Sequence, residues 1–448
     1  MPSLWVVITR RGLPVAWAGL VAGAFAAGGV LHARGVLSID HLPPLHALAR
    51  RPTAASMAAL VPAAVLAAVA VPVLPRLTAH LPLRAALAAA FGVSLAWTVL
   101  LAVSGEGLAW PFTHPQEYLA VLGVVGDDPL GWLAGFTRDL PAYPTHVRGH
   151  PPLPVLVLWA LDAVGLPGPF WAAVFVVTVG CSATVAIGLA VRRVSGEEAA
   201  RRALPYLALS PAAVWIATTM DAFFAGVGAW GTALLLLALP EDGFRAGGPR
   251  ARGRAGRIAL GLGAGTALGA LPYLSYGLVP YLLIPCVAAA VVLGGTGVRA
   301  ARAAVLACLA GMAAVSALFA AGGFWWPDGV AATHAEWAAD PGAARPYLYF
   351  LFANLAVLAL VTGPATAAGL TAPRLSAGPS AGRVLPVAAL VAVLALDLSG
   401  VTRGEVERIW LPYALWLTAA AGRVGDRRLL AAQALTGLLL QGLVRSPW

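Results

Sequence analysis

Residues 143–154, YPTHVRGHPPLP, place three side chains that can bind an anion or move a proton immediately before an apolar segment. These side chains are His146, Arg148 and His150, and Pro151 and Pro152 follow them. Proline suits the first turn of a helix, so a helix is expected to begin here with its free amides at the cluster. Such a helix start favours negative charge, and arginine offers a fork of donors matched to phosphate. The stretch therefore predicts a site for a phosphorylated ligand, with solvation of the interface or contact with lipid headgroups as the alternative.

The composition indicates that a membrane surrounds this cluster. The chain has 448 residues, of which 60% are hydrophobic and 11% charged, and its mean hydropathy is +0.82. Soluble domains carry roughly 25% charged residues. The net charge of +10 comes from 29 basic residues, all of them arginine. In a membrane protein such arginines collect in cytoplasmic loops, so no nucleic-acid partner is expected. We predict an all-α polytopic protein with about 11–14 transmembrane helices in a cell membrane, most simply a bacterial plasma membrane.

Apolar segments near the length of a membrane span recur along the whole chain. The candidate spans are 13–32, 55–75, 84–103, 169–191, 203–219, 221–240, 257–272, 275–293, 302–322, 346–363, 384–398, 408–422 and 428–444. The first is too long for the apolar part of a signal peptide and is interpreted as a retained span. The segment 151–166 is ambiguous, and the charge of the flanking loops decides its interpretation.

Most arginines lie on cytoplasmic loops if the N-terminus is cytoplasmic and 151–166 does not cross the membrane. If it did cross, the basic clusters VRRVSGEEAARR (191–202) and FRAGGPRARGRAGR (244–257) would face outward. We therefore expect 151–166 to form a half-inserted or re-entrant helix that enters from the outer side. Irregular backbone at membrane depth needs surrounding protein or a water-filled cavity, so a cavity is expected beside this segment.

This topology places on the outer face the short loop after the first span and three more notable loops, at 104–150, 323–345 and 399–407. The loop 104–150 is long, and its EYLAVLGVV and LGWLAGFTRDL stretches have apolar residues at helical spacing, which predicts short interfacial helices. Three regions follow from this organisation: extra N-terminal spans over 1–83, a core over 84–300 that contains loop 104–150, and a C-terminal bundle over 301–448 that contains the two later loops.

Further polar residues mark the predicted outer side. Asp221 lies at a turn between two spans, where an acid is either functional or a helix cap. In RGEVERIW (403–410), Glu405 and Arg408 are three residues apart and can pair on a helix. Asp127 and Asp128 can assist a divalent cation, although a tandem acidic pair in a loop also serves as a helix cap. No cofactor is certain from the sequence.

Five stretches together resemble the polytopic glycosyltransferases of the GT-C fold, in particular the protein O-mannosyltransferase and RgtA/B/C/D-like group. They are QEYLA (116–120), GHPPLPVLVLWALDAVGL (149–166), AVRRVSGEEAARRALPYLALSP (190–211), TMDAFFAGVGAWGTALLLLAL (219–239) and LPYLSYGLVPYLLIP (271–285). The resemblance covers about residues 84–300. Two features depart from the group: Gln116 stands where the first of two acids is usual, and two extra spans precede the core.

The resemblance implies a transferase that moves a sugar, mannose-like or a pentose, from a polyprenyl-phosphate carrier to an acceptor hydroxyl on the outer face. The acceptor would be a glycan, a lipid or a protein, and the reaction would invert the sugar. Glu117 matches the acid that serves as general base in this group. Glu106, directly after a span, and Asp139 are the further candidates.

The donor phosphate would be bound by basic residues on the outer side. His150 matches the histidine of the group's HPP motif, and the chemistry of His146, Arg148 and Arg408 suits the same ligand. The remaining predicted pocket residues are Asp221, Glu405, Tyr118 and Tyr143.

Two other classes of function remain open at this stage. A transporter or lipid flippase would be expected to show inverted repeats and ionisable residues in mid-span. The sequence has no visible repeat, and only Asp162 and Asp397 fall within apolar segments. A catalytically inactive scaffold for envelope assembly is the third interpretation, because Gln116 replaces an acid.

Overall fold

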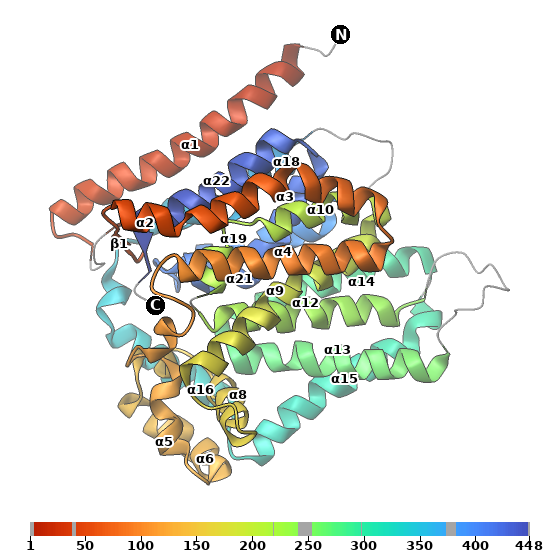
Figure 1. Cartoon of the computed structure of the whole chain (residues 1–448). Coiled ribbons are helices and arrows are strands. Elements are labelled where there is room, and N and C mark those ends of the chain that lie inside the picture. The colour runs from red at the N-terminus through yellow and green to blue at the C-terminus, as the bar shows by residue number, and fades with distance from the viewer. Residues whose placement is uncertain are drawn as a thin grey trace.

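The computed structural model describes residues 4–37, 42–217, 219–240, 253–296, 298–372 and 382–446. Most of the predicted basic segment 244–257 lies outside these ranges. Within them the chain is almost entirely helical (Figure 1), which confirms the all-α prediction.

The first half of the chain contains long helices separated by a group of short ones. Its elements are α1 (Leu4–Ala33), β1 (Leu48–Ala49), α2 (Ala54–Ala59), α3 (Val61–His80), α4 (Leu83–Val103), η1 (Trp110–Thr113), η2 (Tyr118–Val121), α5 (Leu122–Val125), α6 (Pro129–Asp139), η3 (Leu140–Ala142), α7 (Thr145–Arg148), α8 (Leu153–Ala163), α9 (Gly168–Ser195), α10 (Glu197–Ala208), α11 (Ala213–Ile216) and α12 (Asp221–Ala238).

The second half continues this pattern and ends in a short strand. Its elements are α13 (Arg254–Leu274), η4 (Tyr276–Leu278), η5 (Pro280–Leu282), α14 (Leu283–Thr296), α15 (Val298–Ala321), α16 (Trp326–Ala339), η6 (Pro341–Ala344), α17 (Tyr347–Thr362), α18 (Pro364–Thr371), α19 (Val384–Ser399), α20 (Val406–Ile409), α21 (Leu411–Thr418), η7 (Ala419–Arg423), α22 (Arg427–Leu443) and β2 (Val444–Arg445).

Seven helical segments in the described ranges are long and apolar enough to cross a membrane, and an eighth is added if α17 and α18, bent by 102°, form one broken span. The seven are Val15–Ala33, Ala54–His80, Leu83–Val103, Gly168–Ser195, Asp221–Ala238, Tyr276–Gly294 and Arg299–Ala321. The other predicted spans correspond to helices that are shorter or less apolar. The chain is thus a polytopic membrane protein.

The predicted span 203–219 is interrupted. α10 ends at Ala208, and the chain resumes as the four-residue helix α11 at Ala213. Pro211 lies in the gap, and a proline lacks an amide donor and disfavours helical backbone at the residue before it. The apolar composition of this segment therefore reflects burial within the protein, because residues 203–208 of α10 and all of α11 are buried.

α8 confirms that 151–166 is no full span. It has 11 residues, which corresponds to about 16 Å of helix, against a hydrocarbon core of about 30 Å. Pro151 and Pro152 precede its first residue, as the sequence predicts. Its entry into the bilayer from the outer side stays a prediction.

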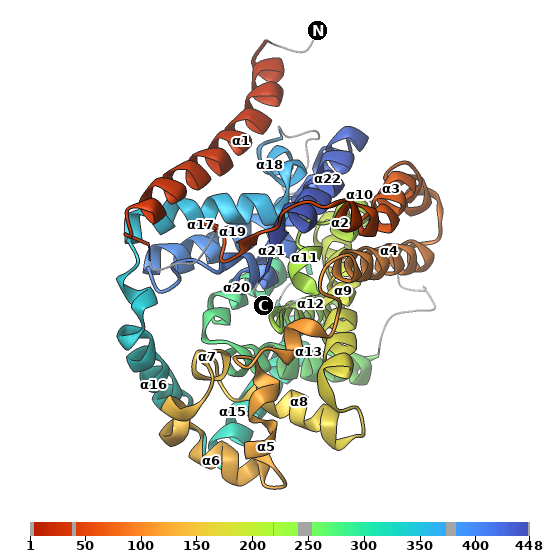
Figure 2. The ribbon, with the colours of Figure 1, turned by 60° about the vertical axis from the view of Figure 1, so that its left-hand side comes forward.

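The loop 104–150 folds into the expected short helices. They gather at one end of the molecule, together with α8 and α16 (Figure 2). Asp128 caps α6, since its Oδ1 accepts a hydrogen bond of 2.8 Å from the Gly131 amide. For Asp128, this contact agrees with the helix-cap interpretation of the Asp127–Asp128 pair.

One hydrophobic core runs from Leu45 to Val444, so all three predicted regions contribute to it. α12 lies at its centre, packed between α9 and α13 (Figure 1). Small residues allow these close approaches. A Cβ on Gly226 would meet the carbonyl oxygen of Val179 on α9. The antiparallel pair β1–β2 joins the segment after α1 to the end of the chain.

Candidate functional site

Glu117 and His146 form a buried pair at the end of the molecule that carries the short helices. His146 Nδ1 lies 2.9 Å from Glu117 Oε1, and the two side chains are 3% and 2% exposed. Gln116 fixes this geometry, because its backbone carbonyl accepts from the His146 amide at 3.2 Å. Its side-chain Oε1 accepts from the Thr145 amide at 2.8 Å. Gln116, which stands where an acid was expected, thus links α7 to the segment that carries Glu117.

The second carboxylate oxygen of Glu117 is buried and has no hydrogen-bond partner among the described residues. A buried acceptor without a partner costs roughly 1–3 kcal/mol. An incoming hydroxyl group would remove this cost by donating a hydrogen bond to Oε2. The pair therefore has the form of a general base that is held by one oxygen and open at the other.

His150 and Tyr118 lie against this pair. The Tyr118 ring centroid is 5.9 Å from that of His146 and 5.7 Å from that of His150. His150 Nδ1 is 2.8 Å from the His146 carbonyl oxygen. Burial, followed by the positive charges of Arg408 and His146, lowers the pKa of His150 to about 3. The neutral ring must donate from Nδ1 because a carbonyl only accepts. Nε2 is then an acceptor, which suits a sugar hydroxyl better than a phosphate.

Arg408 is the buried cation of the site. Its Nη2 lies 2.7 Å from Glu405 Oε2 and its Nη1 lies 3.5 Å from Asp221 Oδ2. The pairing of Glu405 with Arg408, predicted from their spacing, is confirmed. Burial alone would raise the pKa of Glu405, but Arg408, His46 and Arg345 lower it to about 2. This carboxylate therefore stays ionised.

Glu405 has a left-handed backbone, with φ of 60°, and is the one non-glycine residue of the described ranges with positive φ. This conformation costs roughly 1–2 kcal/mol for a residue with a Cβ, and such strain is typical of functional segments. The preceding Gly404, with φ of 100°, allows the sharp turn. The turn directs Glu405 toward Arg408 and toward Arg345, whose Nη1 lies 3.8 Å from Glu405 Oε1.

Glu407 is a further buried carboxyl group, which lies within the RGEVERIW stretch but was not among the predicted site residues. Its Oε1 accepts a 3.0 Å hydrogen bond from the His46 amide, and its Oε2 has no hydrogen-bond partner in the described part of the chain. Burial raises the pKa of Glu407 to about 7, and the negative charge of Glu405 adds to this. Glu407 is thus close to half-protonated at neutral pH.

The Glu117 pair and the Arg408 group share one region. Burial raises the pKa of Tyr118 well above its usual value, the negative charges of Asp221 and Glu117 add to this rise, and Arg408 opposes it. Charges shift the pKa of the Tyr118 phenol in this way when they are close to it. The structure therefore brings together seven predicted residues, which we call the outer cluster: Glu117, Tyr118, His146, His150, Asp221, Glu405 and Arg408.

Four predicted residues lie elsewhere. Arg148 pairs with Glu336 on α16 at 3.4 Å. Asp139 is on the surface, paired with Arg138 at 2.9 Å, and this hydrogen bond lowers its pKa. Tyr143 stacks on Phe136, with centroids 5.5 Å apart, inside the loop's aromatic core.

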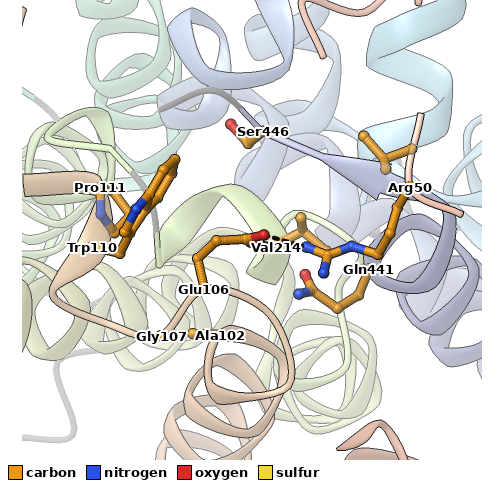
Figure 3. A pocket seen from close by; sticks show the side chains of 10 residues that line it. Arg50, Ala102, Glu106, Gly107, Trp110, Pro111, Val214, Gln441 and Ser446 are labelled. Carbon is orange, nitrogen blue, oxygen red and sulfur yellow. Dashed lines mark hydrogen bonds and ion pairs between the residues drawn. The ribbon is translucent and has the colours of Figure 1, made fainter. Parts of the chain in front are cut away.

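Glu106 is the fourth residue outside the outer cluster. It pairs with Arg50 at 2.8 Å and with Arg445 at 3.2 Å. Figure 3 shows it pointing toward Arg50 in a separate pocket that Trp110 and Gln441 also line. Two arginines occupy its oxygens, which leaves it poorly placed as a general base.

No set of three or more His, Cys, Asp or Glu side chains that could hold a metal ion occurs in the described ranges. The sequence signal for such a site was Asp127–Asp128, of which Asp128 is the cap of α6. Sequence reasoning missed Arg345 and His46, which lie beside the outer cluster, because each is a single polar residue in a segment between apolar helices.

Comparison with known proteins finds similarity only among solved structures. No protein-family model matches the sequence. No curated protein matches it either. The chain is similar to ArnT from Cupriavidus metallidurans in the apo state, with 19% identity and a TM-score of 0.40 over 69% of this chain and 58% of that one. It is also similar to ArnT from Cupriavidus metallidurans bound to undecaprenyl phosphate, with 19% identity and a TM-score of 0.42 over 70% and 61%. The chain spans about three fifths of the length of these structures.

Proposed function

We propose that this protein is a membrane glycosyltransferase that moves a sugar from a polyprenyl-phosphate donor to an acceptor hydroxyl on the outer face of the membrane. The observation that carries the proposal is the buried Glu117–His146 pair, with Glu117 Oε2 open, beside the cation Arg408. The resemblance of the Glu117 and HPP segments to GT-C glycosyltransferases supports the same assignment.

The reaction is a single displacement at the anomeric carbon. Glu117 Oε2 accepts the proton of the acceptor hydroxyl as that oxygen attacks. A bond forms between the acceptor oxygen and the anomeric carbon, and the bond from that carbon to the phosphate oxygen breaks. The electron pair leaves with the lipid phosphate, and the sugar, a mannose-like hexose or a pentose, is inverted. His146 holds Glu117 Oε1, so the carboxylate keeps its orientation.

The leaving phosphate is assigned to the side of the outer cluster that holds Arg408. Asp221 and Glu405 orient its guanidinium, and Arg345 adds a second cation beside Glu405. Preorganised positive charge at the leaving group lowers the barrier. His150 is neutral and presents an acceptor nitrogen, so we assign it to a sugar hydroxyl. Arg148, which turns to α16, is at most an outer contact.

The Glu117→Gln variant tests the base. It removes the proton acceptor but keeps the shape of the side chain, so transfer of sugar from a polyprenyl-phosphate donor should fall about 100-fold or more. Membrane expression and thermal stability should stay near those of the wild type. Radiolabelled donor and purified protein in lipid nanodiscs provide the measurement.

Glu106→Gln is the matched control, because it is a second carboxylate of the same loop with both oxygens paired. Its transfer rate should stay within about threefold of the wild type, because the substitution removes only two partly exposed ion pairs. The reverse order of the two variants would overturn the assignment of Glu117. A wild-type protein that moves the lipid-linked sugar across a bilayer without consuming it would instead favour transport. A protein without either activity would favour a scaffold.

A further inference from the structure

Four arginines gather around one recess where α13 and α15 begin. Arg254 and Arg257 belong to the first turn of α13, and Arg299 and Arg302 to the first turns of α15. The other residues that line this recess are Ala300, Ala303 and Leu306. Every described residue of the lining is thus either a cation or apolar.

The recess lies at the end of the helix pair opposite to the outer cluster. At their other ends, Tyr273 of α13 stacks on Phe319 of α15 with centroids 4.2 Å apart. Phe324, just after α15, contacts Phe136 of α6 in the outer loop, with centroids 5.8 Å apart. α13 has 21 residues, which is about 30 Å of helix and the thickness of a hydrocarbon core. The recess and the outer cluster therefore lie at opposite ends of the α13–α15 pair.

The two helices are held together tightly, so their first turns keep a fixed separation. A Cβ on Gly265 would meet the carbonyl oxygen of Cys308, and one on Gly261 would meet that of Ala304. The starts of α13 and α15, each a positive dipole end, thus lie side by side at the arginines. Their fields add to the four formal charges.

An apolar wall continues from the recess along α15. Leu306 is 53% exposed and Leu309 is 56% exposed, and they are three residues apart on one helix face. Both belong to residues 299–321, the part of α15 that is long and apolar enough to cross a membrane. A ligand that fits the whole surface has a negatively charged head for the arginines and a hydrocarbon chain for the leucines.

We propose that this recess, which we call the basic recess, binds the headgroup of an anionic phospholipid, with its acyl chains along Leu306 and Leu309. A headgroup with two phosphates, as in diphosphatidylglycerol, fits best, because four guanidinium groups provide two for each phosphate. Arginines on cytoplasmic loops are common in membrane proteins. What distinguishes these four is that they converge on one recess between two packed helices, next to exposed leucines.

The test compares diphosphatidylglycerol with phosphatidylcholine of the same chains, and with soluble pyrophosphate. The full chain is purified in detergent, and lipid binding is counted by native mass spectrometry and by the shift in Tm. Diphosphatidylglycerol should bind and raise the Tm, while phosphatidylcholine should not. The Arg299→Gln/Arg302→Gln variant should bind it about tenfold more weakly. With phosphatidylcholine added in place of diphosphatidylglycerol, the Tm of this variant should equal that of the wild type.

Arg427→Gln/Arg428→Gln is the matched control, since these two exposed arginines also begin a helix but are not among the residues that line the basic recess. It should bind diphosphatidylglycerol as the wild type does. An equal loss in both variants would mean that total surface charge attracts the lipid, which would overturn the proposal. Pyrophosphate that raises the Tm as much as the lipid would also overturn it, in favour of a soluble anion. Sugar transfer is not part of this readout.

Discussion

The three glutamates of the outer region, Glu117, Glu405 and Glu407, differ in the groups that they contact. Glu405 contacts Arg408 and Arg345 and has a pKa of about 2. Glu407 receives one hydrogen bond, from a backbone amide, and has a pKa of about 7. Glu117 contacts a histidine through one oxygen. A carboxylate that contacts arginines holds their guanidinium groups in position, whereas a carboxylate with an open oxygen can accept a proton. These partners separate the roles of three residues of the same type.

Glu407 should make the protein less stable as the pH rises through neutrality. Its folded pKa lies above the usual 4.5, so the folded state holds a proton that the unfolded state releases between about pH 5 and pH 7. The free energy of unfolding should fall across that window by on the order of 3 kcal/mol. Glu405 has a lowered pKa and contributes the opposite slope, but only below about pH 4.5.

Glu407→Gln keeps an oxygen for the His46 amide and removes the titration. Its Tm in detergent should therefore stay level from pH 5 to pH 8, while that of the wild type falls. At pH 8 the variant should be the more stable protein. Parallel Tm curves for the two proteins would refute the raised pKa.

At the scale of elements, the outer cluster depends on how α17 and α19 hold the segment before α20. Asn354 on α17 is buried, and its Nδ2 donates 2.9 Å hydrogen bonds to Asp397 Oδ1 on α19 and to the Thr402 carbonyl oxygen. Its Oδ1 accepts from the Gly404 amide at 3.3 Å. One side chain thus fixes the backbone on both sides of the turn that presents Glu405.

Asn354→Leu should release this turn and so displace Arg408. Asn354 is a positioning residue, so we expect the KM for the polyprenyl-phosphate sugar to rise about tenfold, with a smaller change in kcat. The loss of buried hydrogen bonds should also lower the free energy of unfolding by roughly 1–3 kcal/mol. Steady-state kinetics with varied donor provide the measurement.

Thr362→Val is the control on the same helix. The Thr362 hydroxyl donates to the carbonyl oxygen of Leu358, one turn earlier in α17, so its loss leaves the turn before α20 in place. KM and kcat should match those of the wild type. If Asn354→Leu lowers stability but leaves KM unchanged, Asn354 supports the fold and does not position Arg408.

At the scale of the whole molecule, local patterns predicted the elements, while contacts across the chain determined the site. Hydropathy predicted the long apolar helices, and proline before 153 predicted the start of α8. The spacing of Glu405 and Arg408 predicted their pairing. The contact of His46 with Glu407 joins residues 361 positions apart, and no local pattern encodes it. Hydropathy also could not separate spans from buried protein helices such as α10 and α11, because both interiors select apolar residues.

The orientation of the whole molecule across the membrane is a prediction from the distribution of its arginines. We expect the loop 104–150 outside and the starts of α10 and α15 inside. Single cysteines at exposed sites test this: Arg138→Cys in the outer loop, with the Arg138 side chain 78% exposed, and Glu198→Cys at the start of α10, with the Glu198 side chain 80% exposed. Cys286 is exposed and is first changed to alanine, whereas Cys181 and Cys308 are buried. In intact cells an impermeant maleimide should label position 138 and not 198, and permeabilised cells should show both. Labelling of 198 alone in intact cells would invert the topology, and the outer cluster would then face the cytoplasm.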